Sequence, residues 1–548
     1  MTFVITQRCC SDASCVAECP VDCIRPRPED PEYRTTEMLY IDPDTCIDCG
    51  ACADACPVDA IYSEFDVPEQ MSRYIDINRV YFERHPLDPS MDNFPVAPQR
   101  LPQELGRLRV AIVGSGPAAC YAAEELLQRG DVQVEIFDRL ATPWGLVRNG
   151  VAPDHQETKG VAKMFAAAFR SDAVNFHFNV EVGKHLSLAE LVEHHHAVVY
   201  AVGAASDRRL GIPGEDLAGS HSATEFVAWY NCHPEHAERS FDLSGERAVI
   251  VGNGNVALDV ARILTLDPDE LGQTDIADHA LEALRESNIR EVVVLGRRGP
   301  AQAAYSASEF LALGYLPGVD VVIDEDELVL DEFSQAVLDH PEVEPSLAFK
   351  MELAREYAQR PVHSGNKRIV FRYLVSPTEL TGGDHVESLT YVRNELDANA
   401  NAVPTGETGS IETSLVLRSV GYRGTQVPDL PFDETRGVIP NDRGRVTEVP
   451  GVYTTGWIKR GPRGVIGTNR ADSAETVAML LEDFEAGRLE KPARGRDELV
   501  ALLAQRQPDS IDKARWAAID AAELAAGTSA GRPRVKFVSL DALRATIQ

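Results

Sequence analysis

The stretch RVAIVGSGPAACYAAEELLQRG, residues 109–130, decides the fold of most of this chain. A short apolar strand runs into a turn at Gly114 and Gly116 and then into a helix of small residues. Gly114 permits the tight turn, and Gly116 lets the backbone approach a pyrophosphate at the start of the helix. The next strand, VQVEIFD, ends at Asp138, where an acid is placed to accept a ribose hydroxyl. The residues predicted to line this first nucleotide site are Gly114, Gly116, Pro117, Ala118 and Asp138.

The same pattern recurs in RAVIVGNGNVALDVARIL, residues 247–264, and predicts either a second dinucleotide or a decayed copy of the site. The strand that follows, EVVVLGRRGP, ends in Arg297 and Arg298, where a site for NAD would place an acid on the ribose. Two guanidiniums bond the oxygens of a 2′-phosphate bidentately, and the alternative is a solvated pair of arginines. The arginine pair therefore favours NADPH over NADH.

The string PWGLVRNGVAPDH, residues 143–155 and here called the hallmark segment, follows the first nucleotide site. It resembles the adrenodoxin-reductase family of NADPH:ferredoxin reductases, and the resemblance runs from about residue 109 to about residue 481. The resemblance implies that the first nucleotide site holds FAD. The chain departs from the family at Asp138, where the family usually has Glu, but the shorter acid still accepts ribose hydroxyls.

The resemblance also assigns roles to side chains around both nucleotides. In TTGWIKRGPRGVIGTNRADSAET, residues 454–476, the family sets a Trp against the flavin and holds the isoalloxazine by backbone bonds. The alternative for this Trp is ordinary core packing. His155 and Asp259 are candidates for tuning or protonating the flavin side, against a satisfied His and a helix-surface Asp. The further cofactor contacts implied are Leu146, Val182, Arg208, Asn253, Gly254, Asn255, Val256, Glu309, Trp457, Gly464, Val465 and Ile466.

Nine of the eleven cysteines lie in residues 9–56, and they predict metal ligands. The run CIDCGACADACPVDA, residues 46–60, has the C-x2-C-x2-C-x3-C-P spacing of bacterial iron–sulfur proteins, whose fourth cysteine binds a second cluster. Zinc also uses C-x2-C pairs but does not need this ending. The run RCCSDASCVAECPVDCI, residues 8–24, is its duplicate. By this symmetry a [4Fe–4S] cluster is expected on the second cysteine set, defined as Cys19, Cys46, Cys49 and Cys52.

The duplicate run lacks one ligand, because Asp12 stands where a cysteine is expected. Three thiolates remain in the first cysteine set, defined as Cys9, Cys15 and Cys56, and they suit a [3Fe–4S] cluster. This half resembles the seven-iron bacterial ferredoxins, in which the further cysteine, here Cys23, is free. The C-x5-C gap is shorter than the usual seven. It leaves open whether Cys9 or Cys10 is the ligand and whether a fourth iron binds.

Length and charge limit the classes of function. A chain of 548 residues predicts roughly three to four domains. The formal net charge of −33 argues against a nucleic-acid or anionic-membrane partner. No apolar run approaches the roughly 18 residues of a membrane span, and the start of the chain does not look like a secretory signal. A reducing, cytoplasmic location is therefore expected, in which structural disulfides are rare.

The fold expected is multidomain: a ferredoxin-like α+β iron–sulfur domain followed by two α/β Rossmann-type dinucleotide-binding domains. Proline-rich residues 69–106 predict an irregular connector, in which YIDINRVYF, residues 74–82, is either a strand or a docking segment. The expected bounds are 1–68 for the two-cluster ferredoxin domain, 107–206 and 423–548 for the FAD domain, 207–422 for the inserted NADPH domain, and 485–548 for a C-terminal helical extension.

These parts predict electron transport from NADPH through FAD and the clusters to an external acceptor, because flavin exchanges both hydrides and single electrons. The acceptor could be a separate ferredoxin or a haem monooxygenase. One rival is an electron-transfer flavoprotein of the glutamate-synthase small-subunit or bifurcating-transhydrogenase type, which lacks the hallmark segment. Another rival is a non-catalytic redox carrier or sensor, which would not need the arginine pair. Failure to oxidise NADPH with any artificial acceptor would rule out the enzyme hypothesis.

Overall fold

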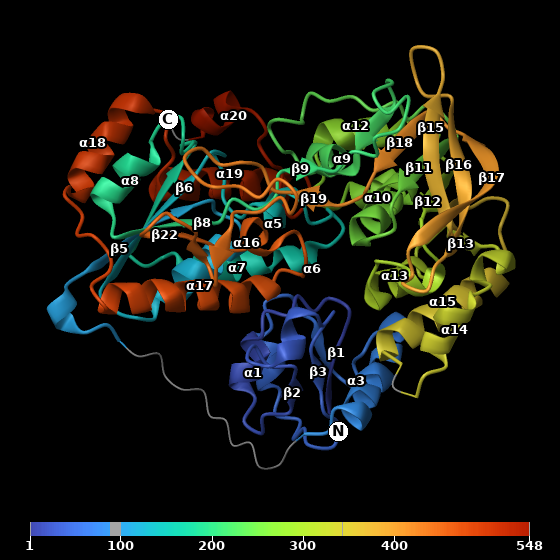
Figure 1. Cartoon of the computed structure of the whole chain (residues 1–548), viewed down its shortest axis with the longest axis horizontal. Coiled ribbons are helices and arrows are strands. Elements are labelled where there is room, and N and C mark those ends of the chain that lie inside the picture. The colour runs from blue at the N-terminus through green and yellow to red at the C-terminus, as the bar shows by residue number, and fades with distance from the viewer. Residues whose placement is uncertain (1, 88–99, 342, 547–548) are drawn as a thin grey trace.

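Two mainly parallel sheets covered by helices form the larger part of the molecule, and a small cysteine-rich lobe lies below their junction in Figure 1. The structure is a computed structural model that describes residues 2–87, 100–341 and 343–546. We call the two larger parts the first-sheet lobe and the second-sheet lobe, and residues 2–87 the cysteine-rich lobe. This arrangement places both predicted nucleotide sites and the first cysteine set near junctions between lobes.

The first sheet has seven strands in the order β20-β21-β22-β8-β5-β6-β7, and β22 through β7 are parallel. The central strand β5 is almost continuously apolar because helices cover both faces of the sheet. The strands are β5 (Leu108–Val113), β6 (Val132–Asp138), β7 (Val174–Phe178), β8 (Ala197–Tyr200), β20 (Asn441–Asp442), β21 (Arg445–Val446) and β22 (Val452–Thr454).

Helices from both ends of the sequence cover this sheet (Figure 1). Helix α4 consists mostly of small buried residues, so α17 packs closely on it, and the Ser473 hydroxyl donates to the Ala118 carbonyl oxygen at 2.9 Å. The helices of this lobe are α4 (Pro117–Leu127), α5 (Leu146–Asn149), α6 (Gln156–Lys159), α7 (Val161–Ala168), α8 (Leu188–His194), α16 (Trp457–Arg460), α17 (Thr468–Glu485), α18 (Arg496–Arg506), α19 (Lys513–Ser529) and α20 (Leu540–Ala545), with a 3-10 turn η3 (Gln103–Leu105).

The second sheet has six parallel strands in the order β10-β18-β11-β12-β14-β13, with an antiparallel three-stranded sheet, β15-β16-β17, beside it. Its strands are β10 (Ser220–Ser222), β11 (Arg247–Val251), β12 (Glu291–Leu295), β13 (Val319–Ile323), β14 (Lys367–Arg372), β15 (Val375–Thr381), β16 (Ser388–Leu396), β17 (Ala402–Glu412) and β18 (Leu415–Arg418). Its helices are α9 (Ala223–Tyr230), α10 (Asn255–Thr265), α11 (Pro268–Leu271), α12 (Asp278–Arg285), α13 (Ala307–Leu313), α14 (Glu332–Leu338) and α15 (Pro345–Gln359), with 3-10 turns η4 (Pro300–Gln302) and η5 (Glu325–Leu328).

The chain crosses between the two sheets through β9 (Ser206–Asp207) and β19 (Tyr422–Arg423), which pair antiparallel. The outgoing and returning segments therefore lie side by side, and the second-sheet lobe is an insertion in the first. These two strands span the residues at which the sequence places its domain boundaries.

The cysteine-rich lobe repeats a strand–helix–strand unit, which matches the duplication of the cysteine runs. Strand β1 pairs antiparallel with β4, and β2 pairs antiparallel with β3. The residue before each short helix, Ala13 or Gly50, has a left-handed backbone, with φ of 63° and 77° respectively. The elements are β1 (Phe3–Ile5), α1 (Ser14–Glu18), β2 (Ile24–Arg25), η1 (Pro31–Arg34), β3 (Tyr40–Ile41), α2 (Ala51–Ala55), β4 (Ile61–Ser63), η2 (Glu69–Met71) and α3 (Arg73–Arg84).

The irregular connector expected at 69–106 is wrong for its first part, because residues 73–84 form helix α3. The strand alternative for residues 74–82 is also wrong. The side-chain oxygen of buried Asn78 accepts the Ile41 backbone N–H at 2.9 Å, and its amide donates to the Ile5 carbonyl oxygen at 2.8 Å. The segment therefore docks on the edge of β1 and β3 as a helix. Residues 88–99 of the expected connector lie outside the described residues.

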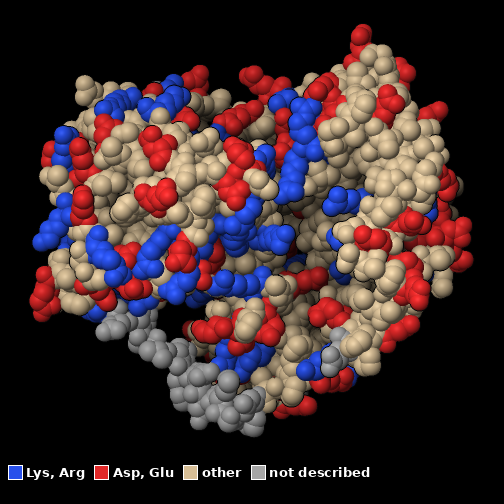
Figure 2. All heavy atoms as spheres, in the orientation of Figure 1, with Lys and Arg blue, Asp and Glu red and all other residues tan. Residues whose placement is uncertain are grey.

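Basic and acidic side chains are unevenly spread on the face shown in Figure 2. Lys and Arg gather in the hollow between the lobes, whereas Asp and Glu occupy much of the outer surface. A basic hollow in an acidic molecule concentrates anionic ligands there. Among the described residues, no helix is long and apolar enough to cross a membrane.

Candidate functional site

The first glycine turn follows β5 and leads into α4. Gly114 has φ +105°, and a Cβ atom there would lie 2.4 Å from the Ala201 carbonyl oxygen. Gly116 is extended and precedes Pro117, the first residue of α4. A Cβ atom on Gly145 of the hallmark segment would lie 2.9 Å from the Gly116 Cα. Glycine at these positions keeps side chains away from the start of α4, which suits the pyrophosphate of a dinucleotide.

Asp138 ends β6 beside this turn. One carboxylate oxygen accepts the Ser115 backbone N–H at 2.9 Å and the Ser115 hydroxyl at 2.6 Å. The other accepts the Leu140 N–H at 2.9 Å. Burial raises the pKa of Asp138, although these hydrogen bonds oppose the rise. The carboxylate thus braces the glycine turn, and its bond to a ribose stays a prediction.

The loop predicted to hold the flavin lies between α16 and α17. Gly464 has φ +86°, and the Val465 backbone N–H donates to the Thr468 hydroxyl at 3.1 Å. Trp457 is half-buried, with its ring 5.3 Å from the ring of Tyr422. A half-buried Trp beside a positive-φ glycine leaves ring surface for a planar ligand.

The remaining predicted flavin contacts are apolar. Leu146 in α5 is 37% exposed, and Val182 is half-buried at the edge of the core of the first-sheet lobe. Ile466, from the flavin loop, packs against a different core cluster of the same lobe. Together with the glycine turn, these residues fit FAD as the group held by the first-sheet lobe.

The second glycine turn repeats the first. Gly252 has φ +109°, and a Cβ atom there would lie 2.2 Å from the Ser419 carbonyl oxygen. Gly254 precedes α10 with an extended backbone. The Asn255 side-chain oxygen accepts the Ser306 N–H at 2.7 Å, which ties the turn to the start of α13. The second-sheet lobe therefore also presents an open helix start, and the contacts of Asn253 and Val256 with a nucleotide stay predictions.

Arg297 and Arg298 are exposed directly after β12, as the sequence predicts for a pair facing solvent or a phosphate. The Arg298 guanidinium donates to the Gln302 carbonyl oxygen at 3.4 Å. Arg208, after β9, is likewise exposed. Strands β11 and β12 are adjacent and parallel, so the arginine pair and the glycine turn share one edge of the sheet. This edge is where parallel α/β sheets bind nucleotides, so the residues fit NADPH.

Residues predicted from three separate segments converge where the two sheet lobes meet. One ring nitrogen of His155, one carboxylate oxygen of Asp259 and one of Glu309 all lie within 4.8 Å of one another. His155 belongs to the hallmark segment, whereas Asp259 and Glu309 lie on α10 and α13. The His155 Nε2 and Glu309 Oε2 atoms are 3.8 Å apart. The cluster therefore joins the two predicted nucleotide sites.

Sequence reasoning missed the cation at the centre of this cluster. Buried Arg262 donates to Asp154 and, at 2.7 Å, to Asp259, and it lies 3.5 Å from Glu309. Burial raises the pKa of Asp259 against the attraction of Arg262. Burial also acts to raise the pKa of Asp154, but the attraction of Arg262 outweighs it, so the pKa of Asp154 is lowered. The spacing of Asp259 and Arg262, three residues apart on one helix, was the available signal. A resident guanidinium makes a metal ion here unnecessary.

The cysteines form two groups, as the duplicated runs predict. Five cysteines line one cavity together with apolar side chains, including Phe3: Cys19, Cys23, Cys46, Cys49 and Cys52. The Cys19 sulfur accepts the Cys23 N–H at 3.4 Å, and the two sulfurs are 3.5 Å apart. Four of these thiolates, Cys19, Cys46, Cys49 and Cys52, with an N–H donor to the Cys19 sulfur, fit a [4Fe–4S] cluster.

The first cysteine set is more buried. The Cys9 sulfur accepts the Ser11 N–H at 3.4 Å and the Leu39 N–H at 3.5 Å, and the Cys56 sulfur accepts the Ala60 N–H at 3.3 Å. Cys15 is buried. These N–H···S bonds are the kind that support cluster ligands, and they fit an iron–sulfur cluster on this set.

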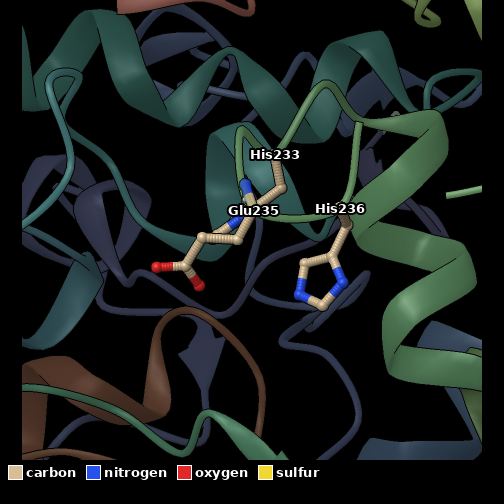
Figure 3. A group of neighbouring side chains, drawn as sticks. All are labelled: His233, Glu235 and His236. Atoms are coloured by element: carbon tan, nitrogen blue, oxygen red, sulfur yellow. Dashed lines mark hydrogen bonds between the residues drawn. The ribbon is translucent and has the colours of Figure 1, made fainter. Parts of the chain in front are cut away.

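A second group of metal-type donors lies on the loop after α9, shown in Figure 3: His233, Glu235 and His236. The Glu235 carboxylate points away from the His236 ring in this view and pairs with Arg139. The Glu235 N–H donates to the His233 Nδ1 atom at 3.3 Å. Because local bonds engage two of the three donors, we assign no metal to this loop.

Comparisons with known proteins match both a nucleotide-binding part and an iron–sulfur part of this chain. Residues 108–298 match the family described as pyridine nucleotide-disulphide oxidoreductase, and residues 39–62 match the 4Fe-4S binding domain. A probable ferredoxin/ferredoxin--NADP reductase of Mycobacterium bovis is 47% identical over 98% of this chain and 94% of its own length. The NADPH-ferredoxin reductase FprA of Mycobacterium tuberculosis is 49% identical over 79% of this chain and 97% of its own.

A solved structure of Mycobacterium tuberculosis FprA in complex with NADPH superposes with a TM-score of 0.77 at 48% identity, covering 81% of this chain and all of that one. The fold is thus that of a pyridine nucleotide oxidoreductase of the FprA type with an iron–sulfur domain at its N-terminal end. The chain belongs to the family of ferredoxin/ferredoxin--NADP reductases, whose sequences it matches over nearly its whole length.

Proposed function

We propose that this chain is an NADPH:ferredoxin oxidoreductase that carries its own iron–sulfur domain. Electrons pass from NADPH on the second-sheet lobe to FAD on the first-sheet lobe, then to a [3Fe–4S] and a [4Fe–4S] cluster and to an external one-electron acceptor. A separate ferredoxin or a haem monooxygenase would serve as acceptor. The observation that carries the proposal is the meeting of His155 with Asp259 and Glu309, which joins the two nucleotide sites.

The residues around this meeting point position the nucleotides and partly offset the charges of the buried carboxylates. Arg262 pairs with both Asp154 and Asp259 and offsets one of their two negative charges, which lowers the repulsion of an anionic dinucleotide at the junction. His155 and Asp259 are the side chains placed to tune or protonate the flavin side. Bound FAD supplies the exchange of a hydride for single electrons. Arg297 and Arg298 select the 2′-phosphate, and Arg208 and Glu309 complete the pocket.

The cysteine sets hold the clusters in series within one lobe. We assign Cys9 rather than Cys10 to the first cluster, supported by the two N–H donors on the Cys9 sulfur. Cys23 remains a free thiol in this assignment, beside Cys19. The hallmark segment counts against an electron-transfer flavoprotein of the glutamate-synthase type, and the exposed arginine pair counts against a passive carrier.

The test is turnover and spectroscopy of the purified holoenzyme. NADPH should bleach the flavin absorbance, drive reduction of ferricyanide, and change the low-temperature electron paramagnetic resonance of both clusters, whereas NADH should act poorly. Failure to oxidise NADPH with any artificial acceptor would overturn the proposed activity. A silent oxidised sample would instead overturn the three-iron assignment alone.

A further inference from the structure

The first cysteine set lies against the first-sheet lobe at the loop predicted to hold the flavin. The Gly467 N–H donates to the Cys10 carbonyl oxygen at 2.8 Å. A Cβ atom on Gly467 would lie 1.8 Å from the Ser11 carbonyl oxygen, and one on Gly160 would lie 2.6 Å from the Pro57 carbonyl oxygen. The Cys10–Ser11 segment and the Cys56–Pro57 segment therefore both approach the reductase at backbone distance.

Charged side chains fix the orientation of this contact. Arg470, three residues after Gly467, donates to the Asp12 carbonyl oxygen at 2.7 Å. Arg34 and Glu475 pair at 3.3 Å across the same interface. A further pair, Arg8 with Glu157, joins the lobe to α6 at 3.2 Å. These pairs surround the first cysteine set.

The cysteine-rich lobe also binds the second-sheet lobe. The Glu37 carboxylate accepts the Ala307 N–H at the start of α13 at 3.0 Å. Arg73 of α3 pairs with Glu356 of α15. Figure 1 shows α3 beside this part of the second-sheet lobe. Contacts to both sheet lobes hold the cysteine-rich lobe in place, so it is not a module that swings on a tether.

The second cysteine set faces solvent. Every residue that lines its cavity comes from the first 52 residues of the chain, so neither sheet lobe contributes to it. Cys49 is exposed, and neighbouring Ile47 is 58% exposed. Residues 1–68 carry 4 Arg, no Lys and 14 acidic residues, a net charge of 4 − 14 = −10. An exposed apolar residue in an acidic domain suits a partner with a basic rim and an apolar centre.

We propose that the cysteine-rich lobe works in one docked position, in which the first cysteine set receives electrons beside Gly467 and the second set delivers them at Cys49 and Ile47 to a basic one-electron redox protein. This inference rests on the proposed NADPH oxidation. Per NADPH, two acceptor molecules are each reduced by one electron, NADP⁺ forms, and one proton is released. The order follows from position, because the first set lies between the flavin loop and the second set.

The contact through which the first cysteine set receives electrons is tested with Arg34→Glu, which places a glutamate opposite Glu475. We expect NADPH to bleach the flavin of this variant at the wild-type rate. Its clusters should be reduced at least about tenfold more slowly than those of the wild type, as measured by rapid-freeze electron paramagnetic resonance. Equal cluster reduction in both proteins would overturn the docked position. No flavin bleaching in the wild type would be a failure of the proposed function instead.

The delivering side is tested with Ile47→Lys and with cytochrome c, a basic haem protein, as the probe. Ile47→Lys should raise the KM for cytochrome c about tenfold and leave ferricyanide turnover unchanged. Val329→Lys is the matched control, because Val329 is 69% exposed on the second-sheet lobe, and it should leave the KM unchanged. An unchanged KM in Ile47→Lys, or an equal rise in Val329→Lys, would overturn this face as the docking surface.

A cluster-specific variant tests the order of transfer independently. Cys49→Ser removes the exposed ligand of the second set. After NADPH addition the signal of the first cluster should still disappear, while cytochrome c reduction is lost. If the first cluster stays oxidised in a Cys49→Ser protein whose flavin is bleached, electrons enter through the second set and the proposed order is wrong.

Discussion

At the scale of single residues, we propose that Asp12 sets the number of irons in the first cluster. It occupies the register position that Cys49 occupies in the second run. Its side chain is 5% exposed and accepts a hydrogen bond from Ser14, with Arg470 at 3.9 Å. We therefore expect the missing thiolate, and not a lack of space, to limit the cluster on the first cysteine set to three irons.

We expect Asp12→Cys to convert the three-iron cluster to a four-iron cluster, because it restores the C-x2-C-x2-C spacing. The oxidised protein should lose its paramagnetic signal, and iron content should rise from about seven to about eight atoms per chain. Asp12→Asn is the matched control and should keep the signal. Persistence of the three-iron signal in Asp12→Cys would contradict the assignment of Cys9, Cys15 and Cys56.

Substitution of Arg298 tests whether the arginine pair selects NADPH over NADH. A charge-assisted bond to phosphate contributes about 1.5–3 kcal/mol, so Arg298→Ala should raise the KM for NADPH about 10- to 100-fold. The KM for NADH, which has no 2′-phosphate, should hardly change. Arg285→Ala is the control, because Arg285 is also an exposed arginine of the second-sheet lobe. Equal effects on both nucleotides would show that the arginine pair does not read the 2′-phosphate.

At the scale of elements, the C-terminal helices brace the hallmark segment. Arg148 of α5 donates twice to buried Glu523 of α19, at 2.9 and 2.6 Å. Lys159 of α6 and Lys536 both pair with buried Asp275, at 2.6 and 2.8 Å. Burial lowers the pKa of Lys159 to about 7, although Asp275 opposes the shift. The C-terminal extension thus helps to shape the flavin side.

Removing the shared carboxylate should destabilise the protein, because Asp275→Asn leaves two buried ammonium groups without their counter-charge. The expected loss is about 3–5 kcal/mol in free energy of unfolding, measured from the urea midpoint and from faster amide exchange in α19. Asp278→Asn is the control, since that side chain is 63% exposed, and it should cost less than about 1 kcal/mol. Similar midpoints for both variants would contradict the bracing role.

The glycine turns and cysteine runs could be predicted from local patterns, because each pattern occupies about 20 consecutive residues. Helix α3 was missed because its Tyr, Ile, Val and Phe residues favour strands, and its buried positions at Tyr74, Asn78 and Phe82 include a polar residue. The Arg148–Glu523 pair joins residues 375 positions apart, so no local pattern reveals it.

At the scale of the whole molecule, the sequence could name the cofactor-binding parts but not their arrangement. Docking of the cysteine-rich lobe depends on bonds such as Gly467 to Cys10 and Arg470 to Asp12, whose partners are more than 400 positions apart. Arg262 at the lobe junction was overlooked because its partners come from the hallmark segment and α13 as well as its own helix. Tertiary contacts between charged side chains leave no periodic trace in a sequence.

Buried histidines should make the stability of the whole protein fall in mild acid. His195 is 3% exposed, its Nδ1 atom hydrogen-bonds the Leu191 carbonyl oxygen at 2.8 Å, and burial lowers its pKa to about 4. Burial also lowers the pKa values of His196 and His233 to about 4. In the unfolded chain these rings titrate near 6.5. Between pH 6.5 and 4 the unfolded state therefore binds more protons, and the free energy of unfolding falls as pH falls.

The His195→Gln variant isolates one of these rings, because glutamine keeps a hydrogen-bond donor for Leu191 but does not titrate. For His195 alone the linked loss between pH 6.5 and pH 5 is about 2 kcal/mol. The urea midpoint of His195→Gln should accordingly fall less than that of the wild type over this interval, with little difference in slope above pH 7. The control His385→Gln, at an exposed ring, should follow the wild-type curve. Parallel curves for all three proteins would mean that His195 is protonated in the native state, and that burial does not hold it neutral.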